Sequence, residues 1–328
     1  MSQSGYRLEF FLPVPILKVM RAVVLFFCFF FFWAMPSSLW AGGGNKPLVV
    51  ASIFPLAEFA KAVGGQDVEV KLLLPPGADP HSWELSPQDV LALRRARLLV
   101  TVGGGLEPWL DDFLKGLSPK NLRTVFMVSE PLKHAHANHD HHHHHGFDPH
   151  VWLDFPRDIE FVEKLAQVLG KIMPAKKEIF LQNARKAKLM LQTLHEAYKN
   201  SLGACRQKLV PLAGHMAFGY WEKNYGLDFV TLAGLSPEAE PTPKTLYQLI
   251  KVIEKNGLKA VYYNEPQNIK FAEIIARETG AKVFYLSTGA ILTQEEIAQK
   301  LSFWDLMWRN LKYLCLGLEC PLQTETTR

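Results

Sequence analysis

The chain has 328 residues, of which 48% are hydrophobic and 21% are charged, and its formal net charge is +4. This composition excludes an intrinsically disordered protein, and the length favours two domains of ordinary size. Because the net charge is small and basic and acidic residues are intermixed, there is no indication of a nucleic-acid partner.

The first 41 residues are typical of an export signal. Arg21 directly precedes an almost continuously apolar run over residues 22–35, and this order matches the charged and hydrophobic regions of a signal peptide. The run has about 14 residues, fewer than the roughly 20 of a spanning helix, so a permanent membrane anchor is the weaker alternative. We expect cleavage after Ala41, and a start at Met20 would leave residues 1–19 as an upstream extension.

Residues 46–155 are predicted to form an N-terminal α/β lobe. Short apolar runs alternate there with helical patterns, which indicates βαβ units and a mainly parallel sheet. A helix is expected to begin at Pro55, and another over residues 86–96 has Ser86 as its cap. The expected strands are 47–54, 68–74 and 97–103.

Residues 156–205 are predicted to form linking helices, including one long helix from about residue 174 to residue 202. Its interior contains no glycine or proline, and apolar residues recur at every third or fourth position. These residues are Phe180, Ala184, Ala187, Leu191, Leu194, Tyr198 and Leu202. At 1.5 Å per residue the helix would be about 40 Å long, so we interpret it as a spine that joins two lobes.

The alternation resumes over residues 206–318, which predicts a C-terminal α/β lobe followed by a tail over 319–328. A helix over 242–257 begins with a threonine cap and a proline and ends with asparagine and glycine, so its boundaries are well marked. The expected strands are 208–214, 227–234, 258–265 and 281–287.

Three cysteines follow the signal. In an oxidising compartment three cysteines permit one disulfide and one free thiol. We expect Cys205 to pair with Cys315 or Cys320, and the sequence does not choose between these two partners.

Eight of the twelve histidines lie in one low-complexity run over residues 134–145, which is predicted to be a mobile, solvated loop. Imidazole is a good ligand for zinc, copper and nickel, so we expect several weak, exchangeable metal sites there. The accessory ligands would be His134, His136, His139, His141, His142, His143, His144 and His145.

Three isolated histidines lie at predicted boundaries between strands and loops. His81 is in a turn between a strand and a capped helix, His150 directly follows the histidine-rich run, and His215 ends the first strand of the second lobe. Ligands bind at strand ends in α/β sheets, so these three side chains could converge on one metal. His195 has no motif around it and is interpreted as an ordinary surface histidine of the long helix.

Four segments resemble successive motifs of the metal-binding subunits of ABC transporters for zinc and manganese, in the same order. They read GADPHSWELSPQD, DPHVWLD, GHMAFGYWEKNYGL and GLSPEAEPTPKTL. The similarity extends from about residue 47 to residue 312. It implies two α/β lobes, each a mainly parallel sheet flanked by helices, joined by one long helix, with the metal buried between them.

The resemblance also implies the ligands and the function. His81 and His150 would come from the first lobe and its edge, and His215 from the second lobe. Manganese-binding members have a carboxylate at the position of His215, whereas an additional imidazole and a histidine-rich run favour zinc. The implied protein is a monomeric, non-catalytic periplasmic receptor that captures zinc and delivers it to an ABC transporter permease with its ATPase.

The fourth zinc ligand is left open. Many members have an aspartate near the end of the last strand, where this chain has Ser287. The fourth ligand could be water, Glu84 or a histidine of the loop. Glu265, at a strand end, could support a ligand from outside the coordination sphere. Three aromatic residues could wall the metal pocket or pack in the core: Trp152, Phe218 and Tyr220.

Other functions remain as alternatives. Three histidines and a water also describe catalytic zinc, but the chain has no HExxH segment and no glutamate placed as an obvious base. A manganese or iron receptor of the same family and a zinc-buffering surface adhesin are the others. Because imidazoles with pKa values near 6.5 bind zinc only when deprotonated, we expect binding to weaken below about pH 6.

Overall fold

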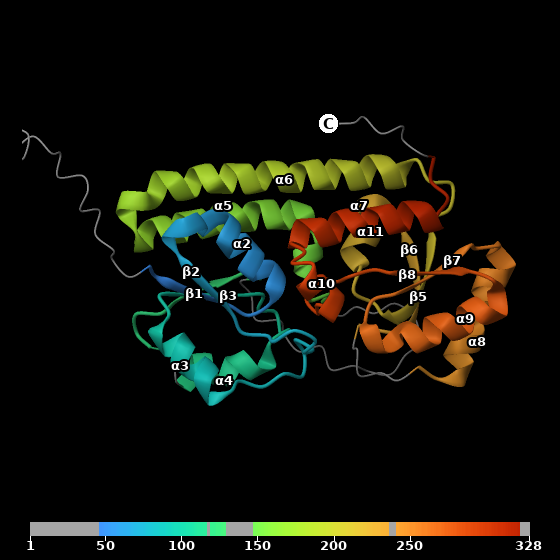
Figure 1. Ribbon diagram of the computed structural model, residues 1–328, viewed down its shortest axis with the longest axis horizontal. Coiled ribbons are helices and arrows are strands. Elements are labelled where there is room, and N and C mark those ends of the chain that lie inside the picture. Colours follow the sequence, from blue (N-terminus) through green and yellow to red (C-terminus); the bar gives the residue numbers. More distant parts are fainter. Residues whose placement is uncertain (1–45, 117–118, 129–146, 236–240, 322–328) are drawn as a thin grey trace, which may run out of the picture. The chain divides into compact units, whose positions relative to one another are not determined.

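The computed structural model describes residues 46–116, 119–128, 147–235 and 241–321. Its strands form two four-stranded sheets, in which every neighbouring pair is parallel (Figure 1). The first sheet has the order β2-β1-β3-β4 and comprises Leu48–Ala51 (β1), Glu69–Leu72 (β2), Leu98–Thr101 (β3) and Arg123–Phe126 (β4). The second has the order β6-β5-β7-β8 and comprises Leu209–His215 (β5), Asp228–Ala233 (β6), Ala260–Tyr263 (β7) and Lys282–Tyr285 (β8).

Helices cover both faces of the first sheet because successive strand side chains point in opposite directions. Val50 and Leu99 pack on one face with α3 (Pro87–Arg95) and α4 (Pro108–Gly116). Val49 and Val100 face the opposite layer, which contains α2 (Phe54–Gly64), α5 (Phe155–Ile172) and α6 (Lys177–Gly203). Three short 3-10 helices precede or connect these elements: Gly65–Asp67 (η2), Val151–Leu153 (η3) and Pro174–Lys176 (η4).

The second sheet is covered in the same way. Ala213 and Val261 pack against α8 (Pro243–Asn256) and α9 (Ile269–Thr279). Leu212 and Tyr262 face α6, α7 (Gly219–Tyr225) and α11 (Phe303–Gly317), and a short helix, α10 (Gln294–Ala298), precedes α11. A short 3-10 helix, η5 (Pro266–Asn268), links β7 to α9. The predicted fold class, two mainly parallel α/β lobes joined by a long helix, is confirmed.

The long helix α6 runs past both sheets (Figure 1). It has 27 residues, and its seven buried residues are the seven that the apolar spacing predicts. Burial of each large apolar side chain contributes about 1.5–3 kcal/mol, so this stripe holds the helix against both lobes. Tyr198 also donates a hydrogen bond from its hydroxyl to the Met307 carbonyl of α11 at 2.6 Å.

Local sequence signals place the helix ends correctly. Ser86 and Thr242 cap α3 and α8 with reciprocal capping boxes, and α8 ends at Gly257, whose φ of 61° lies in the left-handed region that favours glycine. The strand β4 was not predicted, because its sequence, Arg-Thr-Val-Phe, begins with a charged and a polar residue and lacks the continuous apolar run of β1 and β3.

A disulfide joins Cys205, just after α6, to Cys320, just after α11, and Cys315 is a free thiol. Within the described residues, no helix is long and apolar enough to cross a membrane. The signal peptide and the histidine-rich run lie outside the described residues. The domain boundaries at 46–155, 156–205 and 206–318 stay predictions, since one core cluster includes residues of all three segments.

Candidate metal centre

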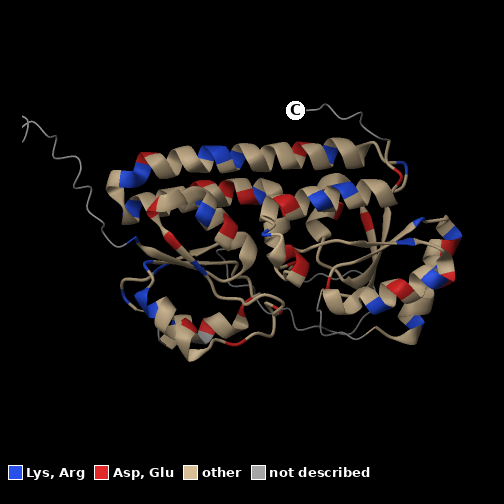
Figure 2. Ribbon diagram, in the orientation of Figure 1, with Lys and Arg blue, Asp and Glu red and all other residues tan. Residues whose placement is uncertain are grey.

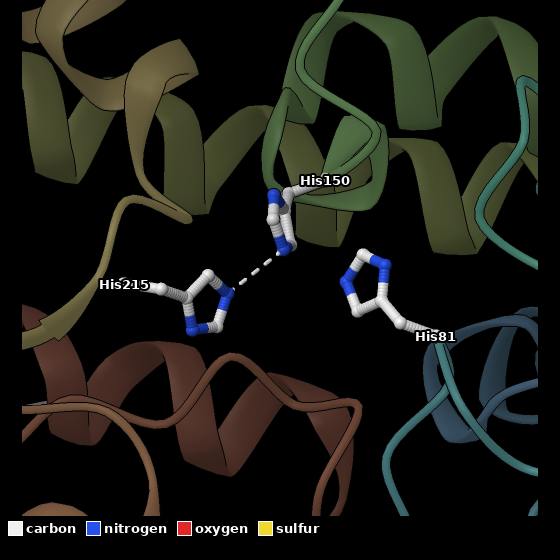
Figure 3. A group of neighbouring side chains, drawn as sticks. All are labelled: His81, His150 and His215. Carbon is white, nitrogen blue, oxygen red and sulfur yellow. Dashed lines mark hydrogen bonds between the residues drawn. The ribbon is translucent and has the colours of Figure 1, made fainter. Parts of the chain in front are cut away.

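Three imidazoles from distant parts of the chain converge between the two sheets (Figure 3). One nitrogen from each of His81, His150 and His215 lies within 4.8 Å of the other two. His150 and His215 are 2% and 4% exposed, and His81 is half-buried. This is the only group of three or more metal-ligating side chains within the described part of the chain.

His81 lies in the loop between β2 and α3. The Asp79 carboxylate accepts the backbone N–H of His81 at 2.8 Å, and the Pro80 carbonyl accepts the Trp109 indole N–H at 2.8 Å. These bonds shape the turn that points the ring at the other two histidines. Its Nε2 atom is buried and has no hydrogen-bond partner among the described residues.

His150 precedes η3 and is held from behind by Asp148. The same carboxylate oxygen accepts the backbone N–H of His150 at 3.0 Å and lies 2.7 Å from the ring Nδ1. Asp148 therefore selects the tautomer with a proton on Nδ1, which leaves the lone pair of Nε2 directed at the centre.

His215 is the last residue of β5, and Glu265 lies behind it at the end of β7. The Glu265 Oε1 atom is 2.7 Å from the ring Nδ1, an ion-pair distance without good hydrogen-bond alignment. Asn268 fixes the other carboxylate oxygen at 2.7 Å. The Asn264 amide donates to the His215 carbonyl at 3.0 Å, and a Cβ at Gly214 would lie 1.9 Å from the Asn264 Oδ1 atom, so the strand end requires glycine there.

The carboxylates of Asp148 and Glu265 lie at the Nδ1 atoms of two rings, away from the facing pair of Nε2 atoms. The Nε2 atoms of His150 and His215 face each other at 3.2 Å, close to the roughly 3.3 Å between two nitrogens of a tetrahedral zinc site. Asp148 and Glu265 contact the opposite nitrogens, on the far sides of the rings. Each carboxylate is therefore placed to orient a ring, and support of a metal ligand by Glu265 stays a prediction.

Burial disfavours the charged form of two of the three rings. Burial, with smaller contributions from His150 and His215, lowers the pKa of His81 to about 3. Burial also lowers the pKa of His150, although Asp148 opposes this shift. Because neutral imidazole is the form that binds metals, little proton release is needed at these two positions.

The space between the histidines holds about one water. The cavity has a volume of about 10 Å³ and is also lined by Asp79, Trp152, Glu265, Thr288 and Ala290, among others. A volume near 10–15 Å³ accepts a single water molecule. The arrangement is thus three nitrogen ligands with one position left for a small ligand.

Neither Glu84, which was considered as the fourth ligand, nor Ser287, which stands where many family members have an aspartate, lines the cavity. Glu84 is exposed and does not line the cavity. Ser287 is fully buried, and its backbone N–H donates to the Asn310 side chain at 2.9 Å, whereas the neighbouring Thr288 lines the cavity. The spacing of residues in the sequence could not show that Thr288 lines the cavity and Ser287 does not, because this depends on the turn that follows β8.

The segment around His150 is bonded to the second lobe. The Trp221 and Asn224 side chains of α7 donate to the Leu153 carbonyl at 3.1 Å and to the Asp154 carboxylate at 2.9 Å. The Trp152 indole donates to the Thr288 carbonyl at 2.7 Å. His150 and His215 are therefore held together on the second lobe, and His81 faces them from the first.

The remaining sequence expectations have mixed outcomes. Trp152 lines the cavity, whereas Phe218 stacks on Phe229 in the core and Tyr220 bonds the Asp148 carbonyl at 3.0 Å. The expectation of an ordinary surface position for His195 is wrong, because its ring is half-buried and its Nδ1 lies 3.0 Å from the Tyr225 hydroxyl.

Asp148 is the functional side chain that the sequence interpretation missed. The sequence contains a pattern that could have identified it, because the tripeptide Asp-Pro-His occurs at both 79–81 and 148–150. In each copy the aspartate accepts the backbone N–H of the histidine two residues later. The repeated tripeptide is thus a local device for orienting a histidine.

Comparison with known proteins agrees with this geometry. Residues 49–315 match the family described as ZnuA, zinc-uptake complex component A, periplasmic. The chain is 33% identical to the zinc-binding protein AdcA of Streptococcus pyogenes serotype M6, over 91% of this chain and 62% of that protein. It is 32% identical to the high-affinity zinc uptake system protein ZnuA of Bacillus subtilis, over 83% of this chain and 87% of that protein.

A solved structure shows the same similarity. The zinc-bound ZnuA-like domain of Streptococcus pneumoniae AdcA aligns with a TM-score of 0.71 and 32% identity, covering 84% of this chain and all of that chain. The present chain spans about three fifths of the length of the AdcA proteins that it matches.

Proposed function

This chain belongs to the ZnuA family of periplasmic zinc-uptake components, and we propose that it captures zinc outside the cytoplasm and delivers it to an ABC transporter permease with its ATPase. The observation that carries the proposal is the convergence of His81, His150 and His215 within 4.8 Å. The proteins called AdcA and ZnuA to which it is similar are described by their names as zinc-binding or zinc-uptake proteins. The receptor would act as an exported monomer.

Zinc suits this centre better than manganese. Three imidazole nitrogens and one open position match the tetrahedral preference of zinc, whereas manganese prefers oxygen ligands. Asp148 and Glu265 would raise the basicity of two ligands and balance the charge of a divalent cation without occupying its coordination sphere. Water is the proposed fourth ligand, since the cavity has room for about one.

A transport site also has to release its metal, and the division of ligands between lobes provides a route. Two ligands lie on the second lobe, and the third is in a loop of the first. Separation of the first-lobe loop from the other two histidines would leave zinc with two protein ligands, which bind it less tightly. The relatives are described by their names as zinc-binding or zinc-uptake proteins, so we propose a receptor and not an enzyme.

The test is metal analysis of the protein purified without chelator, followed by competition with a zinc chromophore. We expect one tightly bound zinc per chain and weaker binding of manganese. The matched control is deletion of residues 134–145, which should remove weak sites and retain the tight one. Loss of the tight site on deletion, or hydrolytic turnover by the zinc-loaded protein, would contradict the proposal.

A further inference from the structure

His81 is held differently from the other two proposed zinc ligands. His150 and His215 each have a carboxylate oxygen 2.7 Å from Nδ1, whereas no ion pair of the His81 ring occurs among the described residues. In Figure 3 the loop that carries His81 approaches from the side opposite to His215. The position of this ring therefore depends on what holds its loop.

The hydrogen bonds within this loop are local. The Asp79 carboxylate accepts the N–H of His81, two residues later, and so orients the histidine inside its own turn. The Ala78 N–H donates to the Pro75 carbonyl, and the Trp83 N–H donates to the Asp79 carbonyl, both at 3.1 Å. These bonds fold the loop on itself, but they do not set its distance from the first sheet.

Trp109, the second residue of α4, joins the loop to that helix. Its indole N–H donates to the Pro80 carbonyl at 2.8 Å, and its ring meets the Trp83 ring edge-on, with centroids 4.8 Å apart. Pro80 directly precedes His81, and Trp83 follows it by two residues. One half-buried side chain thus holds the loop on both sides of the ligand.

Glu107 fixes the start of α4 to the first sheet. Its carboxyl group accepts the Ser52 hydroxyl at 2.6 Å and the backbone N–H groups of residues 102 and 103 at 2.9 Å each. Ser52 follows β1 and residue 102 follows β3, so the ends of two adjacent strands hold one buried side chain. A continuous series of contacts therefore leads from the sheet through Glu107 and Trp109 to His81.

Charge has a different effect on this loop. The connection between β2 and α3, residues 73–86, has two acidic residues, Asp79 and Glu84, and no lysine or arginine. Figure 2 accordingly shows no blue segment there. Negative charges attract a divalent cation over several ångström. This attraction does not fix the ring of His81, whose position relative to the sheet is set through Trp109.

We propose that Trp109 is a positioning residue of the zinc site, which holds His81 where its ring completes the site formed with His150 and His215. The inference rests on the zinc capture proposed above. A ligand that is fixed before the metal arrives loses little conformational freedom on binding, so the indole bond strengthens zinc binding without touching the metal. Breaking the same bond frees the loop to withdraw His81, and the bond therefore slows release.

Trp109→Phe tests this role, because it removes the indole N–H and keeps a ring against Trp83. We expect zinc binding to weaken about 3- to 10-fold, the effect of one hydrogen bond, in competition with a zinc chromophore. Since the two histidines of the second lobe bind zinc first, the loss should appear as faster release in stopped-flow transfer to the chromophore, with an unchanged rate of capture. The matched control is Trp308→Phe, at an exposed indole of α11, which should bind and release zinc like the parent.

A double-mutant cycle with His81→Ala separates positioning from a general structural effect. Because Trp109 acts through His81, Trp109→Phe should weaken zinc binding in the parent but not in His81→Ala. Equal losses in the two backgrounds, or release from Trp109→Phe at the parent rate, would overturn the inference. Zinc binding by His81→Ala that equals the parent's would instead overturn the proposed zinc site itself, so the two failures are distinguishable.

Discussion

At the scale of single residues, two carboxylates lie behind the rings of the proposed metal centre. Asp148 and Glu265 each lie 2.7 Å from the Nδ1 atom of a histidine whose Nε2 faces the other ring. Both pairs are largely buried, so the electrostatic interaction between carboxylate and imidazole is little screened by solvent. Replacing a carboxylate that contacts a metal-binding histidine typically weakens metal binding strongly.

Glu265→Gln should therefore weaken zinc binding about 10- to 100-fold. The amide keeps the size of the side chain but removes the negative charge behind His215. Competition with a zinc chromophore would measure the change. Glu84→Gln is the control, because Glu84 is exposed and outside the cavity. Unchanged affinity in Glu265→Gln, or an equal loss in Glu84→Gln, would show that Glu265 does not support the ligand.

The low pKa of His81 changes the expected response to acid. Three imidazoles with ordinary pKa values near 6.5 would release about two protons per zinc at pH 6. Burial lowers the pKa of His81 to about 3, so that ring is already neutral at pH 6, and burial shifts the pKa of His150 in the same direction. We therefore expect zinc binding at pH 6 to release fewer protons than three unperturbed rings would, measured by calorimetry in buffers of different ionisation enthalpy. Binding should accordingly persist below the pH 6 limit inferred from unperturbed rings.

Asp158 of α5 is a buried carboxyl without an evident role in metal binding. It is fully buried, neither oxygen has a hydrogen-bond partner among the described residues, and burial followed by the charge of Asp154 raises its pKa well above 3.8. The folded protein thus retains a proton that the unfolded chain loses above about pH 4. The free energy of unfolding must therefore fall as the pH rises above about pH 4, because Asp158 ionises in the unfolded chain but not in the folded protein.

Asp158→Asn should remove this penalty. We expect the variant to be about 1–3 kcal/mol more stable than the parent at pH 7, and the difference to vanish below about pH 3, where the aspartate is protonated in both states. Urea unfolding at the two pH values would measure it. A variant that is less stable at pH 7 would indicate that the carboxylate is ionised and paired in the folded protein.

At the scale of elements, the ends of α6 and α11 are fastened together. The disulfide between Cys205 and Cys320 closes a loop with a sequence separation of 115 residues, and Tyr198 bonds the two helices farther along. Because α6 packs against both lobes, a constraint at its end limits the unfolding of the second lobe and of the spine together.

The double variant Cys205→Ser, Cys320→Ser should lose about 2–5 kcal/mol of unfolding free energy. A cross-link across so many residues restricts the unfolded chain more than a short one does. Chemical unfolding under non-reducing conditions would measure the loss. Cys315→Ser is the matched control and should change stability much less, as its thiol is free. Equal effects in the two variants would mean that Cys315 shares the pairing.

At the scale of the whole molecule, zinc would join the two lobes. His150 and His215 are held on the second lobe through α7, and His81 lies in a loop of the first. A metal bound only by the folded protein raises the apparent stability by about 2.7 kcal/mol when free zinc is 100 times the dissociation constant.

His215→Ala should lose most of the rise in unfolding temperature on zinc addition, because it removes one ligand and the contact between the buried rings. The control His195→Ala should keep the full zinc-induced rise, even if loss of its contact with Tyr225 lowers the starting temperature. Thermal unfolding with and without zinc separates these two effects. Full stabilisation of His215→Ala by zinc would contradict a shared site.

The sequence by itself determined the features that depend on neighbouring residues. Helix caps at Ser86 and Thr242, the buried stripe of α6 and the strand positions follow from local hydrogen bonds and from side-chain periodicity. The three histidines were identified because they stand at strand ends and within recognisable motifs. These signals extend over a few residues and can be recognised without knowledge of the fold.

Only the tertiary structure decided which distant groups meet. It places Glu265 instead of Glu84 beside the histidines, pairs Cys205 with Cys320, and bonds the His150 segment to the second lobe. It also lowers the pKa of His81, since burial beside two other histidines is a property of the packed interior. The groups involved are separated by tens of residues along the chain, and their distances are set by the packing of two sheets against one helix, which no local pattern encodes.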